Sequence, residues 1–134
     1  MISPLSITVR FSDLDPMGHV NNAVYLSYFE MARVYYFNKI LSNDWDWQEN
    51  SFLLARNEID YIKPLTLIDS PKISMNLVEI GTKSFTLSYM IKVKDELYTK
   101  GASTLVYFNI GKNKTQVIDA NFRNALMKIN NRTK

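Results

Sequence analysis

The segment from Ala23 to Leu41 constrains the fold of this chain more than any other. It contains neither glycine nor proline and is long enough for about five turns of helix. Apolar residues cover most of its circumference and leave only a narrow polar stripe, which is formed by Ser27, Glu30, Arg33 and Asn38. A helix this apolar in a water-soluble protein is usually buried on most sides. The rest of the chain must therefore wrap around it.

Stretches of alternating apolar and polar residues supply a sheet that can do so. They lie at 6–11, 53–61, 73–77, 85–93 and about 97–110. Short turns between the later stretches predict an antiparallel meander. A short edge strand at 115–118 and a closing helix capped by Asp119 complete the expected elements. The sequence therefore predicts an α+β fold with a curved antiparallel sheet wrapped around one long central helix.

Length and composition limit both the architecture and the chemistry. The 134 residues suit a single domain spanning 1–134, without linkers or repeats. The absence of cysteine excludes disulfides, thiolate metal sites and a cysteine nucleophile. The single histidine, His19, is too few for a histidine-based zinc site. We therefore expect neither a metal nor an organic cofactor.

The chain shows no sign of a membrane or nucleic-acid partner. Its first residues lack the charged and apolar regions of a signal peptide, and no stretch approaches the ~20 apolar residues that span a bilayer. The net charge of +3 comes without a basic run, so no nucleic-acid groove is indicated. We expect a soluble, cytoplasmic protein.

The loop from Asp13 to Asn22 is the best candidate for chemistry. Asp13 and Asp15 come just before the apolar helix, whose free N–H groups and positive potential favour an anion. Those donors could stabilise an oxyanion, and a carboxylate beside them could act as base or nucleophile. Composition and spacing leave a second interpretation open, because Asp-Pro and glycine are common in turns. Asn21 or Asn22 is expected to cap the helix.

Four segments of the chain resemble motifs of the 4-hydroxybenzoyl-CoA thioesterase family, within the hot-dog superfamily. The most specific is Phe11 to Arg33, FSDLDPMGHVNNAVYLSYFEMAR, which combines Asp-x-Asp, Gly-His-Val-Asn-Asn and Tyr-x-x-Tyr-Phe-Glu-x-x-Arg. Asp60 to Leu65 resembles the family's motif at the end of the second strand. Gly81 to Phe85 matches the turn into the fourth strand, and Phe122 to Leu126 resembles the closing helix. The resemblance implies the hot-dog fold and covers most of the chain.

The resemblance also implies a mechanism. The family's catalytic carboxylate is the second aspartate of the loop, which is Asp15 here. It either attacks the thioester carbonyl or activates a water for that attack, while a backbone N–H at a helix N-terminus polarises the carbonyl oxygen. CoA lies across a dimer surface, with its phosphates near basic side chains. Asp13 is not the catalytic position and is expected to bond the backbone of the turn.

Other residues of the loop and helix are candidate site residues, and each of them also fits a purely structural role. Asn22 stands where some relatives carry a histidine or tyrosine near the thioester, so it is a second catalytic candidate and also a candidate helix cap. His19 is a candidate substrate contact and the only imidazole, but it also fits a structural role. Tyr25 could line a substrate pocket or belong to the core. Glu30 and Arg33 lie at i and i+3, so we expect them to pair.

The turn into the fourth strand supplies the remaining candidates. Thr82, Lys83 and Ser84 are the expected substrate-binding residues there, with Lys83 resembling a contact to a CoA phosphate. A lone lysine in a turn is also commonly just solvated.

Together these observations predict an enzyme that hydrolyses the thioester of an acyl-CoA, or of an acyl-carrier-protein conjugate. Because a small sheet leaves an edge strand open, we expect a homodimer or homotetramer. Two alternatives remain: a 3-hydroxyacyl dehydratase on the same fold, whose histidine lies in a proline-rich loop not found here, and a non-catalytic acyl-binding protein.

Overall fold

A computed structural model describes residues 2–130. The elements follow one another as β1 (Leu5–Ser6), a 3₁₀ turn (Phe11–Asp13), α1 (Val24–Ile40), β2 (Ser51–Tyr61), β3 (Lys72–Ile80), β4 (Ser84–Val93), β5 (Glu96–Asn109), β6 (Lys114–Thr115) and α2 (Ala120–Met127). All strands pair antiparallel in one sheet of order β1-β3-β4-β5-β2, and β6 pairs with the end of β5. None of the helices within 2–130 is long and apolar enough to span a membrane.

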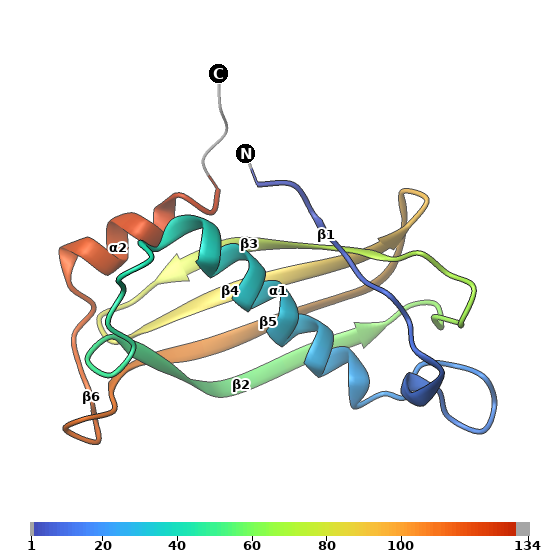
Figure 1. The fold of residues 1–134 in the computed structure, drawn as a ribbon, viewed down its shortest axis with the longest axis horizontal. Coiled ribbons are helices and arrows are strands. Elements are labelled where there is room, and N and C mark those ends of the chain that lie inside the picture. The colour runs from blue at the N-terminus through green and yellow to red at the C-terminus, as the bar shows by residue number, and fades with distance from the viewer. Residues whose placement is uncertain (1, 131–134) are drawn as a thin grey trace.

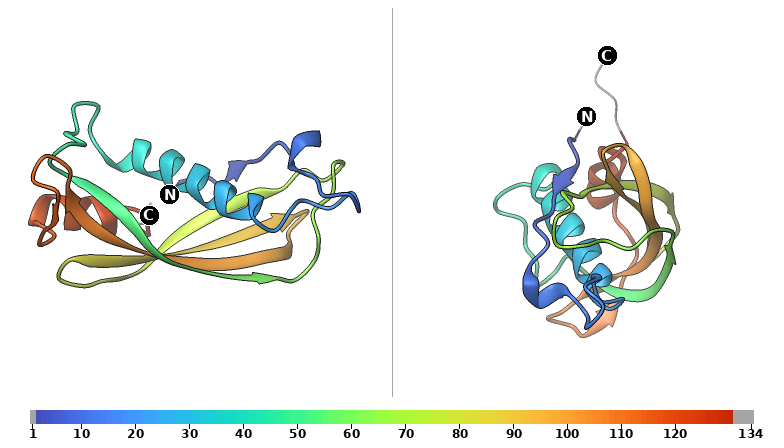
Figure 2. Two further views of the ribbon diagram at one scale, coloured as in Figure 1. Left: turned by 90° about the horizontal axis from the view of Figure 1, so that it is seen from below. Right: turned by 90° about the vertical axis from the view of Figure 1, so that its right-hand side faces the viewer.

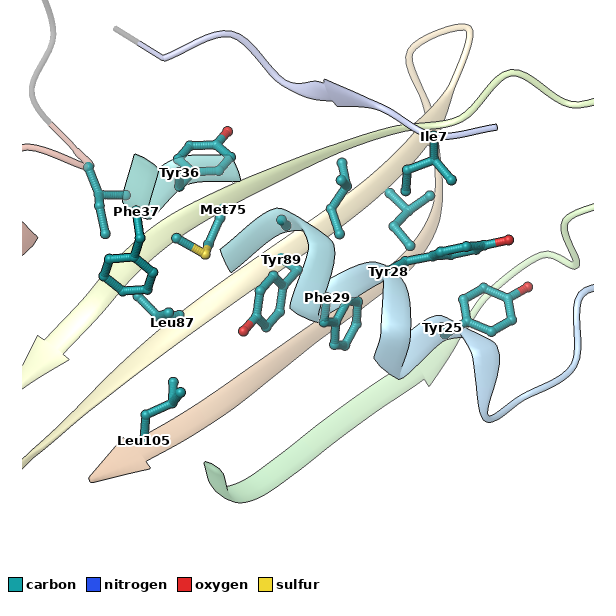
Figure 3. Close-up of a cluster of buried hydrophobic side chains, with 14 of the residues drawn as sticks. Ile7, Tyr25, Tyr28, Phe29, Tyr36, Phe37, Met75, Leu87, Tyr89 and Leu105 are labelled. Carbon is teal, nitrogen blue, oxygen red and sulfur yellow. The ribbon is translucent and has the colours of Figure 1, made fainter. Parts of the chain in front are cut away.

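The sheet curves around α1, which lies in its concave face (Figures 1 and 2). This arrangement confirms the predicted α+β hot-dog architecture, because the apolar helix is covered by sheet along its length. Aromatic rings fill the layer between them, and the ring of Phe29 stacks on that of Tyr89 with centroids 4.2 Å apart (Figure 3). At the C-terminal end of α1, Phe37 and Phe85 pack against Phe122 of α2, which closes that end of the core.

Gly101 of β5 permits the close approach of α1 to the sheet. A Cβ atom at this position would lie 2.6 Å from the ring of Phe29 and 2.6 Å from the carbonyl oxygen of Glu58. No side chain fits there unless both the ring of Phe29 and the backbone of strand β2 move.

The predicted strand at 6–11 is wrong beyond its first residue. Only Leu5 and Ser6 pair with β3, and the chain then continues without a strand partner and turns at Phe11–Asp13. Ile7 and Val9 are buried as the alternation indicates, but Phe11 is 82% exposed. The alternation identified two buried residues correctly, but it overestimated the length of the strand.

Two local expectations about α1 are also wrong. Ala23 occupies the N-cap without a side-chain bond, so neither asparagine caps the helix in the expected way. Asn21 instead accepts the N–H of Ala23 on Oδ1 at 2.9 Å. The expected pair of Glu30 and Arg33 does not form among the described residues, because Arg33 is buried against the sheet while Glu30 is exposed.

Candidate functional site

The loop before α1 is a tight hairpin fixed by its own backbone. Leu14 and Val20 form a bridge, the N–H of Asp15 donates to the carbonyl of His19 at 2.7 Å, and that of Gly18 donates to the carbonyl of Asp15 at 3.0 Å. Gly18 has φ +82°, a conformation that favours glycine. Val20 also donates to the carbonyl of Leu65 at 2.9 Å, which fixes the loop against the chain that follows β2.

The carboxylate of Asp15 has one oxygen anchored and one open. Oδ1 accepts the backbone N–H of Met17 at 2.9 Å and that of His19 at 3.1 Å. No donor from residues 2–130 reaches Oδ2, and the side chain is only half-buried. The turn therefore orients the carboxylate and leaves an oxygen that can act on a bound molecule. The turn interpretation of the loop therefore holds for Asp15, and its catalytic role stays a prediction.

Asp15 lies on a surface depression at the N-terminal end of α1. Four of the predicted site residues line it together: Asp15, His19, Asn22 and Tyr25. The remaining lining comes from the loop and from the end of β2: Met17, Val20, Tyr61, Ile62, Lys63 and Pro64. Tyr61 and Lys63 belong to the motif from Asp60 to Leu65, but neither was predicted as a site residue.

Two tyrosines connect this depression to the core. Tyr25 is buried, and its hydroxyl oxygen accepts the N–H of Leu65 at 3.2 Å. Tyr61 packs edge-on against Tyr25, with ring centroids 5.1 Å apart, and its hydroxyl donates to the carbonyl of Asn22 at 3.0 Å. Burial raises the pKa of both phenols, so both remain protonated near neutral pH. Tyr61 thereby ties the end of β2 to the start of α1.

The first turn of α1 presents a free amide at Tyr25. The N–H groups of Ala23, Val24 and Leu26 donate to Asn21 Oδ1, to the Asn21 carbonyl and to the Ala23 carbonyl, respectively. The N–H of Tyr25 has no acceptor within residues 2–130. This donor comes with the positive potential of the helix N-terminus.

Asp13 has a structural role, as expected. It is 2% exposed and accepts four hydrogen bonds, three from Arg10 and one from the hydroxyl of Tyr28 at 2.8 Å. Burial alone would raise the pKa of this carboxyl, but the hydrogen bonds and the charge of Arg10 outweigh it and hold the pKa below its ordinary value. Burial raises the pKa of Tyr28, and its bond to Asp13 raises it further.

The other predicted contacts lie at the far end of the molecule (Figure 1). Ser84 and Leu53 both pair with Val106 of β5, so Ser84 lies near the start of β2. Asp15 lies near the other end of β2, because it shares its depression with Tyr61, eight residues after Leu53. At a strand rise of about 3.3 Å per residue, eight residues separate the Ser84 end of the sheet from the Asp15 end by roughly 25 Å. The turn itself is well held, since the carbonyls of Thr82 and Lys83 accept backbone N–H groups at 2.8 and 2.7 Å. Within one chain Thr82, Lys83 and Ser84 therefore do not meet Asp15.

Comparison with known proteins agrees with this geometry. The family model of the thioesterase-like superfamily matches residues 9–126. The long-chain acyl-CoA thioesterase FadM of Escherichia coli is 30% identical, over 90% of this chain and 93% of FadM. The uncharacterized protein YsmA of Bacillus subtilis is 31% identical over 63% of this chain, a match that spans 56% of YsmA.

Solved structures show the same relationship. A thioesterase from Thermus thermophilus, whose structure is described as a complex with coenzyme A and Zn, superposes with a TM-score of 0.85 at 34% identity, covering 98% of this chain and 96% of that one. A thioesterase described as predicted, from Bacillus stearothermophilus, gives 0.84 at 26% identity and 93% coverage of both chains. The chain belongs to the thioesterase-like superfamily and is a thioester hydrolase of the hot-dog fold.

Proposed function

We propose that this protein hydrolyses acyl-CoA thioesters with Asp15 as the reacting carboxylate. The observation that carries the proposal is the state of that side chain: Oδ1 is held by two backbone N–H groups, and Oδ2 has no donor among residues 2–130. A carboxylate oriented in this way is suited to act on a bound molecule as a base or a nucleophile. The names of the relatives, one a long-chain acyl-CoA thioesterase and one a complex with coenzyme A, support an acyl-CoA as substrate.

The proposed reaction uses groups that already surround the depression. Asp15 takes a proton from water as the resulting hydroxide adds to the thioester carbonyl, or it adds to the carbonyl itself and forms an anhydride that water then cleaves. In both routes the carbonyl oxygen becomes an oxyanion, for which the free N–H of Tyr25 is our proposed donor. Collapse of the intermediate expels the CoA thiolate. In the first route the thiolate takes its proton from the acid that Asp15 has become, and in the second it takes a proton from solvent. His19 and Asn22 line the same depression; we propose His19 as a substrate contact and Asn22 as a second catalytic residue near the thioester.

We further propose that the active form is a homodimer built across β2, alone or as half of a homotetramer. Strand β2 is the last in the sheet order, and Leu53 and Leu54 are each nearly half exposed on it. An open apolar edge of this kind favours pairing with another strand. If two copies of β2 pair antiparallel, the end of the sheet that carries Lys83 in one copy lies level with the Asp15 end of the other. Lys83 could then reach the phosphates of a CoA whose thioester lies at the partner's depression.

Turnover of an acyl-CoA panel, followed by detection of free thiol, tests the reaction. Release of CoA from at least one acyl-CoA supports the proposal, and the matching acyl carrier protein conjugates show which carrier is preferred. Acyl-CoA binding without thiol release would contradict the proposal and favour an acyl-binding protein. Light scattering at micromolar concentration tests the assembly, where a monomer would exclude the dimer. Because acyl-CoA is the proposed substrate, we propose action in the cytoplasm, which fractionation of the source cells would test.

A further inference from the structure

Three lysines share the convex face of the sheet without forming an ion pair. Strands β3 and β4 bury Ile73 and Ile91 in the core around α1, so the neighbouring side chains of Lys72 and Lys92 point to the opposite face. Lys94 follows in the hairpin turn between β4 and β5 (Figure 1). All three side chains are exposed, and none pairs with a carboxylate within residues 2–130. No ion pair in that range therefore compensates their positive charges.

The register of the sheet brings two of these charges together. Lys72 of β3 lies directly opposite Lys92 of β4 in the antiparallel pair. Side chains that face each other in this way have Cβ atoms about 4.5–5.5 Å apart, and like charges at such a position destabilise the sheet. An anion bound between the two ammonium groups would replace this repulsion by attraction. The folded protein is therefore expected to gain stability when an anion binds there.

The three lysines line a depression of about 360 Å³, which we call the lysine depression. Besides the lysines, its lining includes the hydroxyl groups of Ser70 and Ser74, the apolar side chains of Pro4 and Met90, and one carboxylate, Asp95. Three cations against one anion leave an excess of positive charge. Ammonium and hydroxyl groups can all donate hydrogen bonds to phosphate oxygens. The lining therefore suits a small anion that carries several oxygens and more than one negative charge.

The proposed dimer leaves the lysine depression uncovered. Strand β5 lies between β4 and β2, so the depression is separated from the β2 edge at which two copies would pair. In that dimer, Lys83 of the partner subunit would lie in the turn before its β4, five strand spacings from β4 of this copy. At about 4.8 Å per spacing this separation is roughly 24 Å. A CoA that extends from the Asp15 depression to that lysine would therefore run along the β2 edge and away from the lysine depression.

We propose that the lysine depression binds a small phosphate anion, either inorganic diphosphate or the diphosphate group of a nucleotide. Lys72 and Lys92 would hold the anion between them as point charges, and Lys94 would approach it from the turn. The three lysines come from segments that meet only in the folded sheet, so the anion should bind the folded protein and raise its Tm. The site goes beyond the proposed hydrolysis, which uses groups at the Asp15 depression and at the β2 edge.

Calorimetric titration of the wild-type protein with pyrophosphate, at constant low ionic strength, tests the site without any variant. We expect pyrophosphate to bind and to raise the Tm, whereas chloride at the same ionic strength should do neither. ADP distinguishes the two sources of the diphosphate group. Equal affinities support a free diphosphate, and tighter binding of ADP supports a nucleotide that also packs on Pro4 and Met90. No binding of either probe at millimolar concentration would overturn the proposal.

Variants locate the binding within the molecule. Lys92→Gln should weaken pyrophosphate binding about fivefold, the scale of one exposed charge contact. In phosphate-free buffer the same variant should have a Tm at least equal to that of the wild type, because its repulsion with Lys72 is gone. Reduced affinity with undiminished stability cannot come from misfolding. Lys39→Gln is the matched control, because Lys39 is an exposed lysine of α1 outside the lysine depression, and it should bind pyrophosphate as the wild type does.

Saturation with CoA distinguishes the lysine depression from the site of the substrate. Pyrophosphate binding should persist at saturating CoA, because the two ligands would lie at different parts of the sheet. Loss of pyrophosphate binding under these conditions would assign the lysines to the CoA site and overturn the proposal. Unchanged pyrophosphate affinity in Lys92→Gln would overturn it as well, whether or not the protein hydrolyses acyl-CoA.

Discussion

Replacement of Asp13 by asparagine tests how the loop that carries Asp15 is held. The carboxylate accepts two bonds on Oδ1, from Nε and Nη2 of Arg10, and two on Oδ2, from the Arg10 N–H and the Tyr28 hydroxyl. Asparagine offers one oxygen and one NH₂ group, so two of the four donors must lose their acceptor whichever way the amide turns.

The expected loss of stability in Asp13→Asn depends on how deeply each hydrogen bond is buried. A hydrogen bond to a charged group contributes about 1.5–3 kcal/mol when it is buried. The Arg10 side chain is 72% exposed, so solvent screening reduces its contribution strongly. The bond from Tyr28 is buried, and we therefore expect Asp13→Asn to lower the free energy of unfolding by about 2–3 kcal/mol at pH 7.

The effect must also depend on pH with a defined sign. The pKa of Asp13 is lower in the folded protein than in the unfolded chain, so its contribution is complete above the unfolded pKa and is lost as the pH falls through the folded one. The difference between wild type and variant should stay constant from pH 7 to pH 5 and narrow below about pH 4. Urea unfolding of both proteins at one protein concentration, repeated over that range, measures it. Equal free energies of unfolding at pH 7 would refute this account of the loop. So would a difference between wild type and variant that does not become smaller in acid.

Three further substitutions probe other parts of the molecule. Gly101→Ala should cost about 3 kcal/mol, or about 10 °C in Tm, because its Cβ would overlap the ring of Phe29; an unchanged Tm would show that the helix does not pack this closely. Lys83→Ala should raise KM for acyl-CoA about fivefold and leave kcat and the KM of an acyl-pantetheine unchanged; equal damage to both substrates would indicate a structural role. His19→Gln should retain kcat/KM within about tenfold and keep the acidic limb of the pH profile, because His19 holds the loop through backbone atoms; loss of a limb near neutral pH would make the imidazole catalytic.

The sequence was most informative where local pattern and packing agree. The helix expected from Ala23 to Leu41 forms from Val24 to Ile40, and β3, β4 and β5 lie at the expected positions. It was least informative at the sheet edges. The alternation in strand β2 suggested one buried face, but a bulge after Leu54 shifts its alternation, and its edge position leaves both Leu53 and Leu54 nearly half exposed. Alternation identifies which residues can share a face, whereas the partner of a strand depends on the whole topology.

The same limit applies to the candidate site. The loop motif was sufficient to assign Asp13 a structural role, which its bonds to Arg10 and Tyr28 bear out, whereas the catalytic role of Asp15 stays a prediction. The participation of Tyr61 depends on the end of β2 returning to the start of α1, which no local pattern reports. Arg33 was placed in a polar stripe and expected to pair with Glu30. Its burial follows from the sheet covering that side of the helix, a contact between segments far apart in the sequence.

The central claim is that Asp15 performs the chemistry, and its most direct test is kcat of Asp15→Asn on the best acyl-CoA substrate. The amide keeps the side chain's shape, and its oxygen can still accept the N–H groups of Met17 and His19, so the loop should remain folded. Circular dichroism and the Tm of the variant check that it does. We predict a fall in kcat of about a hundredfold or more, the scale of removing a general base, with little change in KM. A correctly folded Asp15→Asn protein with wild-type kcat would contradict the assignment of the catalytic carboxylate.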